Sequence, residues 1–344
     1  MSSDLLDRAP RGGEPPVAAA QPRRRLAVNA GAADRLFRGT ARGGGILVLL
    51  LMALVGGFLT YRAWLALRTA GFSFITTQEW SPGGGSFGIA AIMVGTILIA
   101  IVAIATAVPM ALGTALYISE YAPRWLRRTL IAMVDLMAAV PSVVYGLWGF
   151  FLLQWRVVGL SRWISDWFGW IPIFKVDGVA RHDPLATATA YTSSTFAAGL
   201  VVSLMVAPIA CSVMREAFGQ APAGEREGAY ALGATRWGMI RSVVLPFGRG
   251  AVIGGTMLGL GRALGETIAV VMIISPRFVI QPHILQNGTS SVSSLIALRY
   301  GESSPFSISA LMAAGVSLFV LTLAVNFIAA QVVARSRSGA VSEA

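Results

Sequence analysis

Charged residues are scarce in this sequence, and so are cysteine and histidine. Of 344 residues only 12% are charged, 55% are hydrophobic, and the mean hydropathy is +0.69. Soluble globular domains usually carry about 25% charged residues, so the composition excludes a chain of that class. The single cysteine, Cys211, excludes an internal disulfide and any cysteine cluster for zinc or iron–sulfur. Because His182 and His283 lie far apart in loops, we expect no metal site.

The sequence contains several long apolar runs that are nearly free of charged residues. Several of them exceed the roughly 20 residues that a helix needs to cross a hydrocarbon core of about 30 Å. The short alternating segments typical of barrel strands are absent from the sequence, and helices satisfy their own backbone in lipid. We therefore predict an all-α polytopic membrane protein. Its six transmembrane helices are expected over residues 46–66, 89–118, 129–153, 191–214, 250–275 and 307–333.

The parts outside the spans differ in composition. The first 44 residues hold eight arginines among Pro, Gly and Ala, which predicts a disordered tail rather than a signal peptide. Within the membrane domain we expect a long cytoplasmic loop and a tryptophan-rich outer insert. The expected division is a tail over 1–44, a first helix with its outer loop over 45–87, the transmembrane domain over 88–334 with the cytoplasmic loop at 215–247 and the insert at 154–190, and a second tail over 335–344.

Basic residues are unevenly divided between the two predicted sides of the membrane. With a cytoplasmic N-terminus, eighteen Lys and Arg lie in cytoplasmic segments and eight in outer segments, and Arg262 remains inside a span. This asymmetry satisfies the positive-inside rule with both termini in the cytoplasm. The net charge of +11 therefore reflects topology and contact with anionic lipid, and we expect no nucleic-acid partner.

Prolines interrupt two of the predicted spans. The second span is long enough that its helix tilts, protrudes or breaks at Pro109. The third contains AAVPSVVYGLWGFF (138–151), where Pro141 frees a backbone carbonyl that Ser142 is placed to satisfy. Ordinary kinks explain both prolines, and so do broken helices that line a transport cavity.

The outer insert carries three tryptophans at helical spacing, Trp163, Trp167 and Trp170. This stripe predicts a helix that lies in the outer membrane interface. Contact with an external partner is the alternative.

Two charges lie in the apolar fifth span. GLGRALGETIAVVMIIS (259–275) holds Arg262 and Glu266, which share a face of a continuous helix. A lone charge at mid-bilayer costs roughly 2.5–3.5 kcal/mol on insertion scales, and an i,i+4 ion pair in water recovers only about 0.2–0.5 kcal/mol. An ion pair between Arg262 and Glu266 alone therefore does not explain why both charges lie in this span. Charged residues within spans usually mark substrate paths, and a structural link between helices is the alternative.

The chemistry of this pair suits an oxyanion. Arg262 is predicted to receive it, because a guanidinium offers paired donors that match phosphate oxygens. Glu266 is expected to orient Arg262 or to accept a hydrogen bond from protonated phosphate, and Thr267 and Ser142 complete the predicted substrate pathway. The other acidic residues of the spans are weaker candidates: Asp135 is expected to pack between helices or to lie at an interface, and Glu120 and Glu216 to face cytoplasmic water.

The cytoplasmic loop REAFGQAPAGEREGAYALGATRWGMIRSVVLP (215–246) has its own pattern. It predicts a short helix, a turn at Gly233, and a second helix that stops at Leu245-Pro246. Pro246 suits the first turn of the following span, where its missing N–H costs nothing. Small residues at Gly228 and Ala229 allow another surface to approach closely. An exposed helical elbow of this kind docks into a partner's groove.

This loop resembles the EAA loop of ABC importer permeases. The family pattern is E-A-A-x3-G-x9-I-x-L-P, and its spacing matches throughout, with Gly in place of the first Ala and Val in place of Ile. The matching residues are Glu227, Gly228, Ala229, Gly233, Val243, Leu245 and Pro246. The resemblance implies a type I importer permease fold in which residues 227–246 couple to an ATP-binding subunit.

Two further stretches narrow the resemblance. AAVPSVVYGLWGFF and LGRALGETIAVVMIIS resemble phosphate-importer permeases of the PstC type, within a likeness that covers residues 88–333. The implied chain is not catalytic and forms half of a translocation pathway in a bacterial plasma membrane. The implied partners are a second permease (PstA-type), two ATP-binding subunits (PstB-type) and an external phosphate-binding protein (PstS-type).

The chain itself is expected to hold no cofactor, with ATP and Mg bound by the partner subunits. A Walker A loop needs a lysine that reaches the phosphates, and the only lysine is Lys175, in PIFKVDG. Two alternatives stay open. One is a permease for another oxyanion such as molybdate, sulfate or phosphonate, and the other is a stand-alone secondary transporter.

Overall fold

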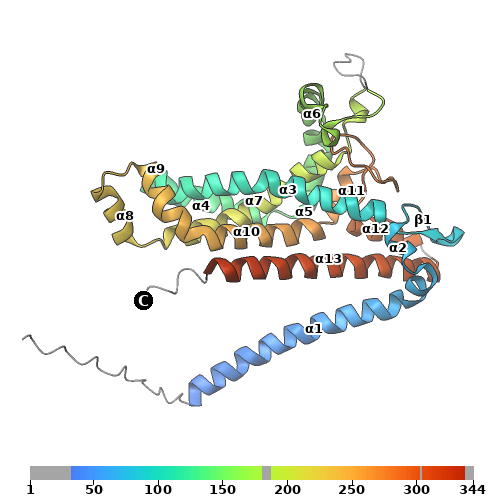
Figure 1. Cartoon of the computed structure of the whole chain (residues 1–344), viewed down its shortest axis with the longest axis horizontal. Coiled ribbons are helices and arrows are strands. Elements are labelled where there is room, and N and C mark those ends of the chain that lie inside the picture. The colour runs from blue at the N-terminus through green and yellow to red at the C-terminus, as the bar shows by residue number, and fades with distance from the viewer. Residues whose placement is uncertain (1–31, 180–186, 303, 338–344) are drawn as a thin grey trace, which may run out of the picture. The chain divides into compact units, whose positions relative to one another are not determined.

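The computed structural model of the chain describes residues 32–179, 187–302 and 304–337. Helices dominate these residues, with one short antiparallel pair of strands (Figure 1). In chain order the elements are α1 (Ala32–Ala70), α2 (Ser73–Thr76), β1 (Trp80–Ser81), η1 (Pro82–Gly84), β2 (Ser86–Phe87), α3 (Ala90–Leu116), η2 (Tyr117–Tyr121), α4 (Arg124–Ala139), α5 (Ser142–Trp148), η3 (Gly149–Leu153), α6 (Gln154–Phe168), η4 (Pro172–Phe174), η5 (Ala188–Ala190), α7 (Thr195–Gly219), α8 (Ala223–Ala231), α9 (Arg236–Met239), η6 (Ile240–Val244), α10 (Leu245–Gly265), α11 (Ile268–Ile273), α12 (Val292–Arg299), η7 (Tyr300–Glu302) and α13 (Pro305–Arg337).

Six helical segments of the described residues are long and apolar enough to cross a membrane. They are Asp34–Ala70, Ala90–Tyr121, Ser142–Phe168, Thr195–Gly219, Arg236–Gly265 and Pro305–Val332. The prediction of an all-α membrane chain with six transmembrane helices is therefore confirmed. The second segment does not break at Pro109, which lies inside α3. This helix continues directly into the π-helical turn η2.

The third span differs from its predicted bounds. A single helix over residues 129–153 is wrong, because α4 ends at Ala139 and α5 begins at Ser142. Val140 takes an extended backbone (φ −65°, ψ 129°). The cause is Pro141, whose ring disfavours helical backbone in the residue before it. The segment long enough to cross a membrane is Ser142–Phe168 instead.

The first helix also begins earlier than predicted. Residues 1–31 of the predicted disordered tail lie outside the described residues, as do residues 338–344 of the second tail. Residues 32–44, however, are helical, because α1 begins at Ala32. Its first turns are supported by an ion pair between Arg38 and Asp34 at 3.1 Å, four residues apart.

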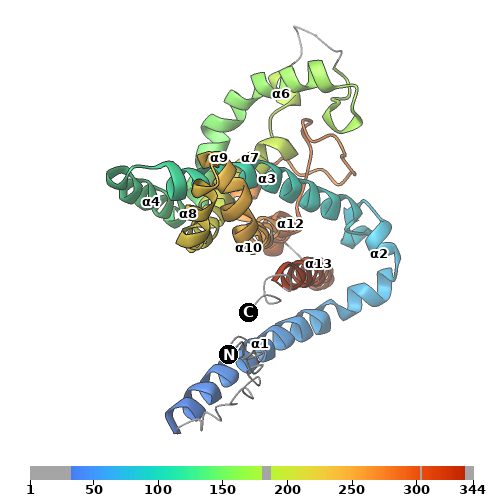
Figure 2. The same cartoon turned by 60° about the vertical axis from the view of Figure 1, so that its left-hand side comes forward.

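The chain divides into two compact units, residues 1–53 and residues 54–344. At the centre of the second unit α3 packs along α7, and α10 contacts both of them (Figures 1 and 2). Helix α4 flanks α7, and α13 packs on α10. Small residues permit these close approaches: a Cβ on Gly199 would lie 2.7 Å from Cβ of Val102, and one on Gly259 2.5 Å from Cγ1 of Val206. Close backbone packing is the usual source of helix association in lipid.

The tightest approach gives a testable expectation for stability. A Cβ on Gly95 of α3 would lie 2.1 Å from the carbonyl oxygen of Ser290. Gly95→Ala should therefore destabilise the fold by about 1–3 kcal/mol through overpacking, seen as a lower unfolding temperature of the purified chain. Gly113→Ala is the matched control on the same helix, because Gly113 has no neighbour within 4 Å. Equal unfolding temperatures for the two variants would contradict the close approach.

The second unit has different elements at its two ends. Helices α8 and α9 lie at one end of the helical bundle, and α2, the strands and α12 lie at the other (Figure 1). Helix α6 projects away from the bundle in both views (Figures 1 and 2). Between the two ends, α10 carries Arg262.

Candidate substrate pathway and coupling surface

Two interrupted helices lie against each other in the second unit. One break separates α4 from α5 at Val140-Pro141, and the other separates α10 from α11 at Glu266-Thr267. Helices α5 and α11 pack together so closely that a Cβ on Gly146 would lie 2.9 Å from Cα of Ala269. Non-helical backbone at membrane depth is tolerated where protein or a water-filled cavity surrounds it. Adjacent breaks are therefore typical of a transport pathway rather than of two separate kinks.

Arg262 lies in the last turn of α10, beside these breaks. Its side chain is exposed in the isolated chain and shares its stripe of α10 with the exposed Leu258. The neighbouring side of the helix, with Gly259 and Ala263, is buried against the core. The hydroxyl of Tyr145 on α5 lies within electrostatic range of the guanidinium. Arg262 is thus not sealed inside dry packing and remains open to a ligand or to another subunit.

The expectation that Arg262 and Glu266 share one helical face is wrong. Helix α10 ends at Gly265, and Glu266 has an extended backbone (φ −66°, ψ 122°). Oε1 of Glu266 accepts a hydrogen bond from the N–H of Ala269 at 3.3 Å, so the carboxylate caps the first turn of α11. The carbonyl of Glu266 accepts a hydrogen bond from the Ser293 hydroxyl at 2.8 Å. Among the described residues Glu266 and Arg262 form no ion pair.

The two hydroxyl residues of the predicted pathway lie at these breaks. Thr267 donates from Oγ1 to the Gly265 carbonyl at 3.1 Å, across the end of α10. Ser142 begins α5 and is half-buried. The carbonyl freed by Pro141 is that of Met137, and it accepts a hydrogen bond from the Tyr145 hydroxyl at 2.9 Å. Tyr145, which the sequence reasoning missed, does what was expected of Ser142. Its only signal was an aromatic hydroxyl one turn after the proline.

The helical elbow forms as predicted up to its last turn. Helices α8 and α9 are joined through Gly233, whose φ of +80° favours glycine. Glu227 and Gly228 are exposed, Ala229 is half-buried, and Leu232 is 91% exposed on the tip. Such an apolar side chain at the tip of a short helix is available to a partner's groove.

The expected helix stop at Leu245-Pro246 is wrong. The backbone continues as the π-helical turn η6 and then as α10, which begins at Leu245 with Pro246 in its first turn. Pro246 cannot donate to the carbonyl one turn earlier, and the wider π-turn accommodates its ring. The elbow and the fifth span therefore form one helical segment, Arg236–Gly265.

The three weaker acidic candidates differ in burial and in their contacts. Glu120 was expected to face water, which is wrong: it is 7% exposed and pairs with Arg226 of α8 at 3.0 Å. Glu216 is exposed as expected and accepts a hydrogen bond from the Gln220 side chain. Asp135 is exposed on α4, not packed between helices within this chain.

The tryptophan-rich insert contacts the loop before α12. Trp163, Trp167 and Trp170 are exposed, the first two on α6 and the third just after it. Asp177 pairs with Lys175 at 2.8 Å and with His283 of the other loop at 3.2 Å. The hydrogen bond from Lys175 lowers the pKa of Asp177, with a smaller contribution from His283. Asp177 is therefore ionised at neutral pH and links the insert to the loop before α12. Arg181 and His182 lie outside the described residues.

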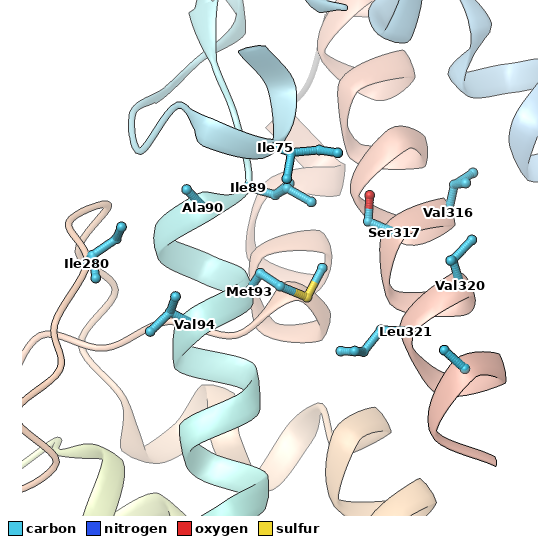
Figure 3. Close-up of a pocket in the computed structure, with 11 residues that line it drawn as sticks. Ile75, Ile89, Ala90, Met93, Val94, Ile280, Val316, Ser317, Val320 and Leu321 are labelled. Atoms are coloured by element: carbon cyan, nitrogen blue, oxygen red, sulfur yellow. The ribbon is translucent and has the colours of Figure 1, made fainter. Parts of the chain in front are cut away.

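A separate apolar pocket of about 630 Å³ lies between α3 and α13 (Figure 3). Its lining includes Met93, Val320 and Leu321, and the hydroxyl of Ser317. That hydroxyl already donates to the Ala313 carbonyl at 3.0 Å. The lining of this pocket holds no cation for an oxyanion, so the breaks beside Arg262 remain the candidate pathway.

Comparison with known proteins agrees with these features. The family model described as binding-protein-dependent transport system inner membrane component matches residues 107–338. Phosphate transport system permease protein PstC of Pasteurella multocida (strain Pm70) is 38% identical over 293 residues, covering 85% of this chain and 89% of the relative. PstC 2 of Mycobacterium tuberculosis (strain ATCC 25618 / H37Rv) is 39% identical over 297 residues, with 85% and 89% covered. PstC of Xylella fastidiosa (strain 9a5c) is 40% identical over 265 residues, with 77% and 79% covered.

Solved structures share the fold at low sequence identity. A bacterial ABC transporter involved in the import of the acidic polysaccharide alginate matches with a TM-score of 0.51 and 20% identity, covering 88% of this chain and 99% of that chain. The bacterial alginate transporter in complex with an alginate pentasaccharide-bound periplasmic protein matches with a TM-score of 0.52 and 18% identity, covering 86% and 96%. The chain therefore belongs to the family of binding-protein-dependent transport system inner membrane components, the ABC importer permeases, and within it to the PstC type.

Proposed function

We propose that this chain is the membrane-spanning permease subunit of an ATP-driven importer of inorganic phosphate. One observation carries the proposal: an exposed arginine, Arg262, lies within a helical segment long and apolar enough to cross a membrane, beside two helix breaks. A planar, permanently charged donor set is well matched to a tetrahedral oxyanion. The printed names of the PstC relatives, which are phosphate transport permeases, support phosphate as that anion.

The remaining groups at the breaks have roles that fit this substrate. The carboxylate of Glu266 uses one oxygen to cap α11, which leaves Oε2 to accept a hydrogen bond from protonated phosphate. Sulfate, fully deprotonated near neutral pH, has no proton to donate. Thr267 and Ser142 supply hydroxyls at the same two breaks.

The chain forms half of the pathway in this proposal. A second, related permease completes it. Of the two ATP-binding subunits of the complex, one docks on the elbow residues Glu227, Gly228, Ala229 and Gly233 of this chain. An external phosphate-binding protein delivers the anion to the outer loops at 68–87, 154–190 and 276–305. Both termini lie in the cytoplasm, as the distribution of basic residues favours. ATP binding by the partners moves the elbow and exposes the Arg262 site alternately to the two sides.

The test is uptake of labelled phosphate by the complete complex in proteoliposomes. We expect uptake to require ATP, the ATP-binding subunits and the binding protein, and to resist competition by excess sulfate, molybdate or phosphonate. Stronger competition by one of these anions than by unlabelled phosphate would assign the chain to that oxyanion instead.

Another oxyanion is the second candidate, because a guanidinium and hydroxyls alone do not distinguish phosphate from its analogues. Glu266→Gln separates the two. If Glu266 senses the phosphate proton, this variant should lose discrimination against sulfate while still transporting phosphate. Unchanged discrimination would remove that role from Glu266.

Transport by the purified chain alone, without ATP-binding subunits, would instead indicate a secondary transporter.

A further inference from the structure

One buried charge pair joins the cytoplasmic ends of three helices. Nη1 of Arg226, on α8, donates to Oε2 of Glu120 at 3.0 Å. The side chain of Glu120 is 4% exposed and that of Arg226 is 21% exposed. Nη2 of the same guanidinium donates to the Phe218 carbonyl at the end of α7. Arg226 thus links α8 of the elbow both to η2, which continues α3, and to α7.

A second contact joins the other arm of the elbow to the same place. The guanidinium of Arg236, at the start of α9, lies over the ring of Tyr121 at 4.9 Å from its centroid. Both arms, before and after Gly233, therefore contact the π-helical turn η2. We call these residues the cytoplasmic clamp: Glu120, Tyr121, Phe218, Arg226 and Arg236.

Stability is a poor explanation for the charge pair in this clamp. Buried ion pairs can often be replaced by apolar side chains without loss of stability. The pair is also incompletely satisfied, because Oε1 of Glu120 and Nε of Arg226 are buried without a partner among the described residues. What a forked guanidinium does supply is fixed direction between the groups it joins. Here those groups are the elbow and the two helices, α3 and α7, at the centre of the bundle.

We propose that the cytoplasmic clamp makes the elbow and the cytoplasmic ends of α3 and α7 move as one body. Glu120 and Arg226 are then positioning residues that turn a displacement of the elbow into rearrangement of the substrate pathway. The inference rests on the proposed function, in which the elbow docks on an ATP-binding subunit.

The first test is the coupling ratio of the complete complex in proteoliposomes, as phosphate imported per ATP hydrolysed. For Glu120→Gln and for Arg226→Lys we expect ATP hydrolysis to persist while the ratio falls about fivefold or more, the lower end of usual coupling between sites. Glu225→Gln is the matched control, since Glu225 is exposed one residue away on α8. A ratio equal to wild type in both clamp variants would overturn the proposal, as would a parallel loss of import and hydrolysis.

The second test needs no phosphate, so it separates failure of the clamp from failure of the proposed function. Spin labels are attached through Tyr117→Cys and Glu225→Cys, both exposed positions, with the buried Cys211 replaced by Ser. With an intact clamp, the label distance between η2 and α8 should stay the same when ATP is added to the complex. In the Glu120→Gln background ATP should change it. A distance that changes with the clamp intact would overturn the proposal.

Discussion

Arg262→Ala should remove most phosphate uptake from the assembled complex. Hydrogen bonds to charged groups contribute about 1.5–3 kcal/mol, so losing this donor should lower kcat/KM for uptake by about 10- to 150-fold. The neighbouring helix breaks supply hydroxyls but, among the described residues at these breaks, no second cation to take over the role. Initial rates of labelled-phosphate uptake across a range of concentrations, in proteoliposomes with equal amounts of complex, give this value.

Two further variants make the Arg262 result specific. Arg249→Ala changes an exposed arginine near the other end of the same helix, and it should leave kcat/KM within twofold of wild type, the scatter expected of surface changes. Arg262→Lys keeps the charge but loses the forked donors, so its uptake should fall between wild type and Arg262→Ala. Wild-type uptake by Arg262→Ala would remove this residue from the mechanism.

Gly233→Val should abolish ATP-driven import while the spans stay folded. The backbone of Gly233 has φ +80°, a conformation that costs an ordinary residue about 1–2 kcal/mol, and more when the side chain is β-branched. No atom lies within 4 Å of a Cβ placed there, so the valine causes no clash and acts on the turn alone. The elbow should then present its two arms at a different angle to the partner. We expect import to fall more than about tenfold, measured beside membrane expression and unfolding temperature.

Gly224→Val is the control for Gly233→Val. Gly224 lies in the first turn of α8, also without a neighbour within 4 Å, but its φ is not positive. The same side chain on the same elbow should therefore leave import nearly intact. Equal losses in the two variants would mean that bulk on the elbow, rather than the geometry of its turn, controls transport.

Local sequence patterns predicted the features that depend on neighbouring residues. Apolar run length located the spans, and Gly233 located the turn of the elbow, because a positive φ selects glycine wherever it occurs. The helix break at Pro141 is only partly predictable. The proline predicts a kink or a break, but the apolar run alone predicts one span over residues 129–153. The carbonyl to which Pro141 cannot donate, that of Met137, was expected to be satisfied by Ser142; it accepts hydrogen bonds from the Val140 N–H and the Tyr145 hydroxyl instead.

Partners distant in the chain explain the rest. Helix α10 ends before Glu266, and the carbonyl of Glu266 accepts a hydrogen bond from the hydroxyl of Ser293, 27 residues later. The helical spacing of the sequence does not predict that contact. Glu120 is buried because Arg226, 106 residues away, returns to it when the elbow folds back. The local sequence around Glu120, a single glutamate at the end of a span, therefore predicts a solvent-exposed side chain. Long-range pairs of this kind decide the geometry of the candidate site, which is why its residue types were predictable and its arrangement was not.

The π-helical turn before Pro246 has a mechanical consequence. Because it lets the backbone pass the proline, α9, η6 and α10 form one rod of 30 residues, about 45 Å long at the rise of an α-helix. The second arm of the elbow begins this rod at Arg236, and Arg262 lies near its other end. In the proposed mechanism we therefore expect a tilt at one end to displace the other end directly, so that movement of the elbow and exposure of Arg262 occur in one step.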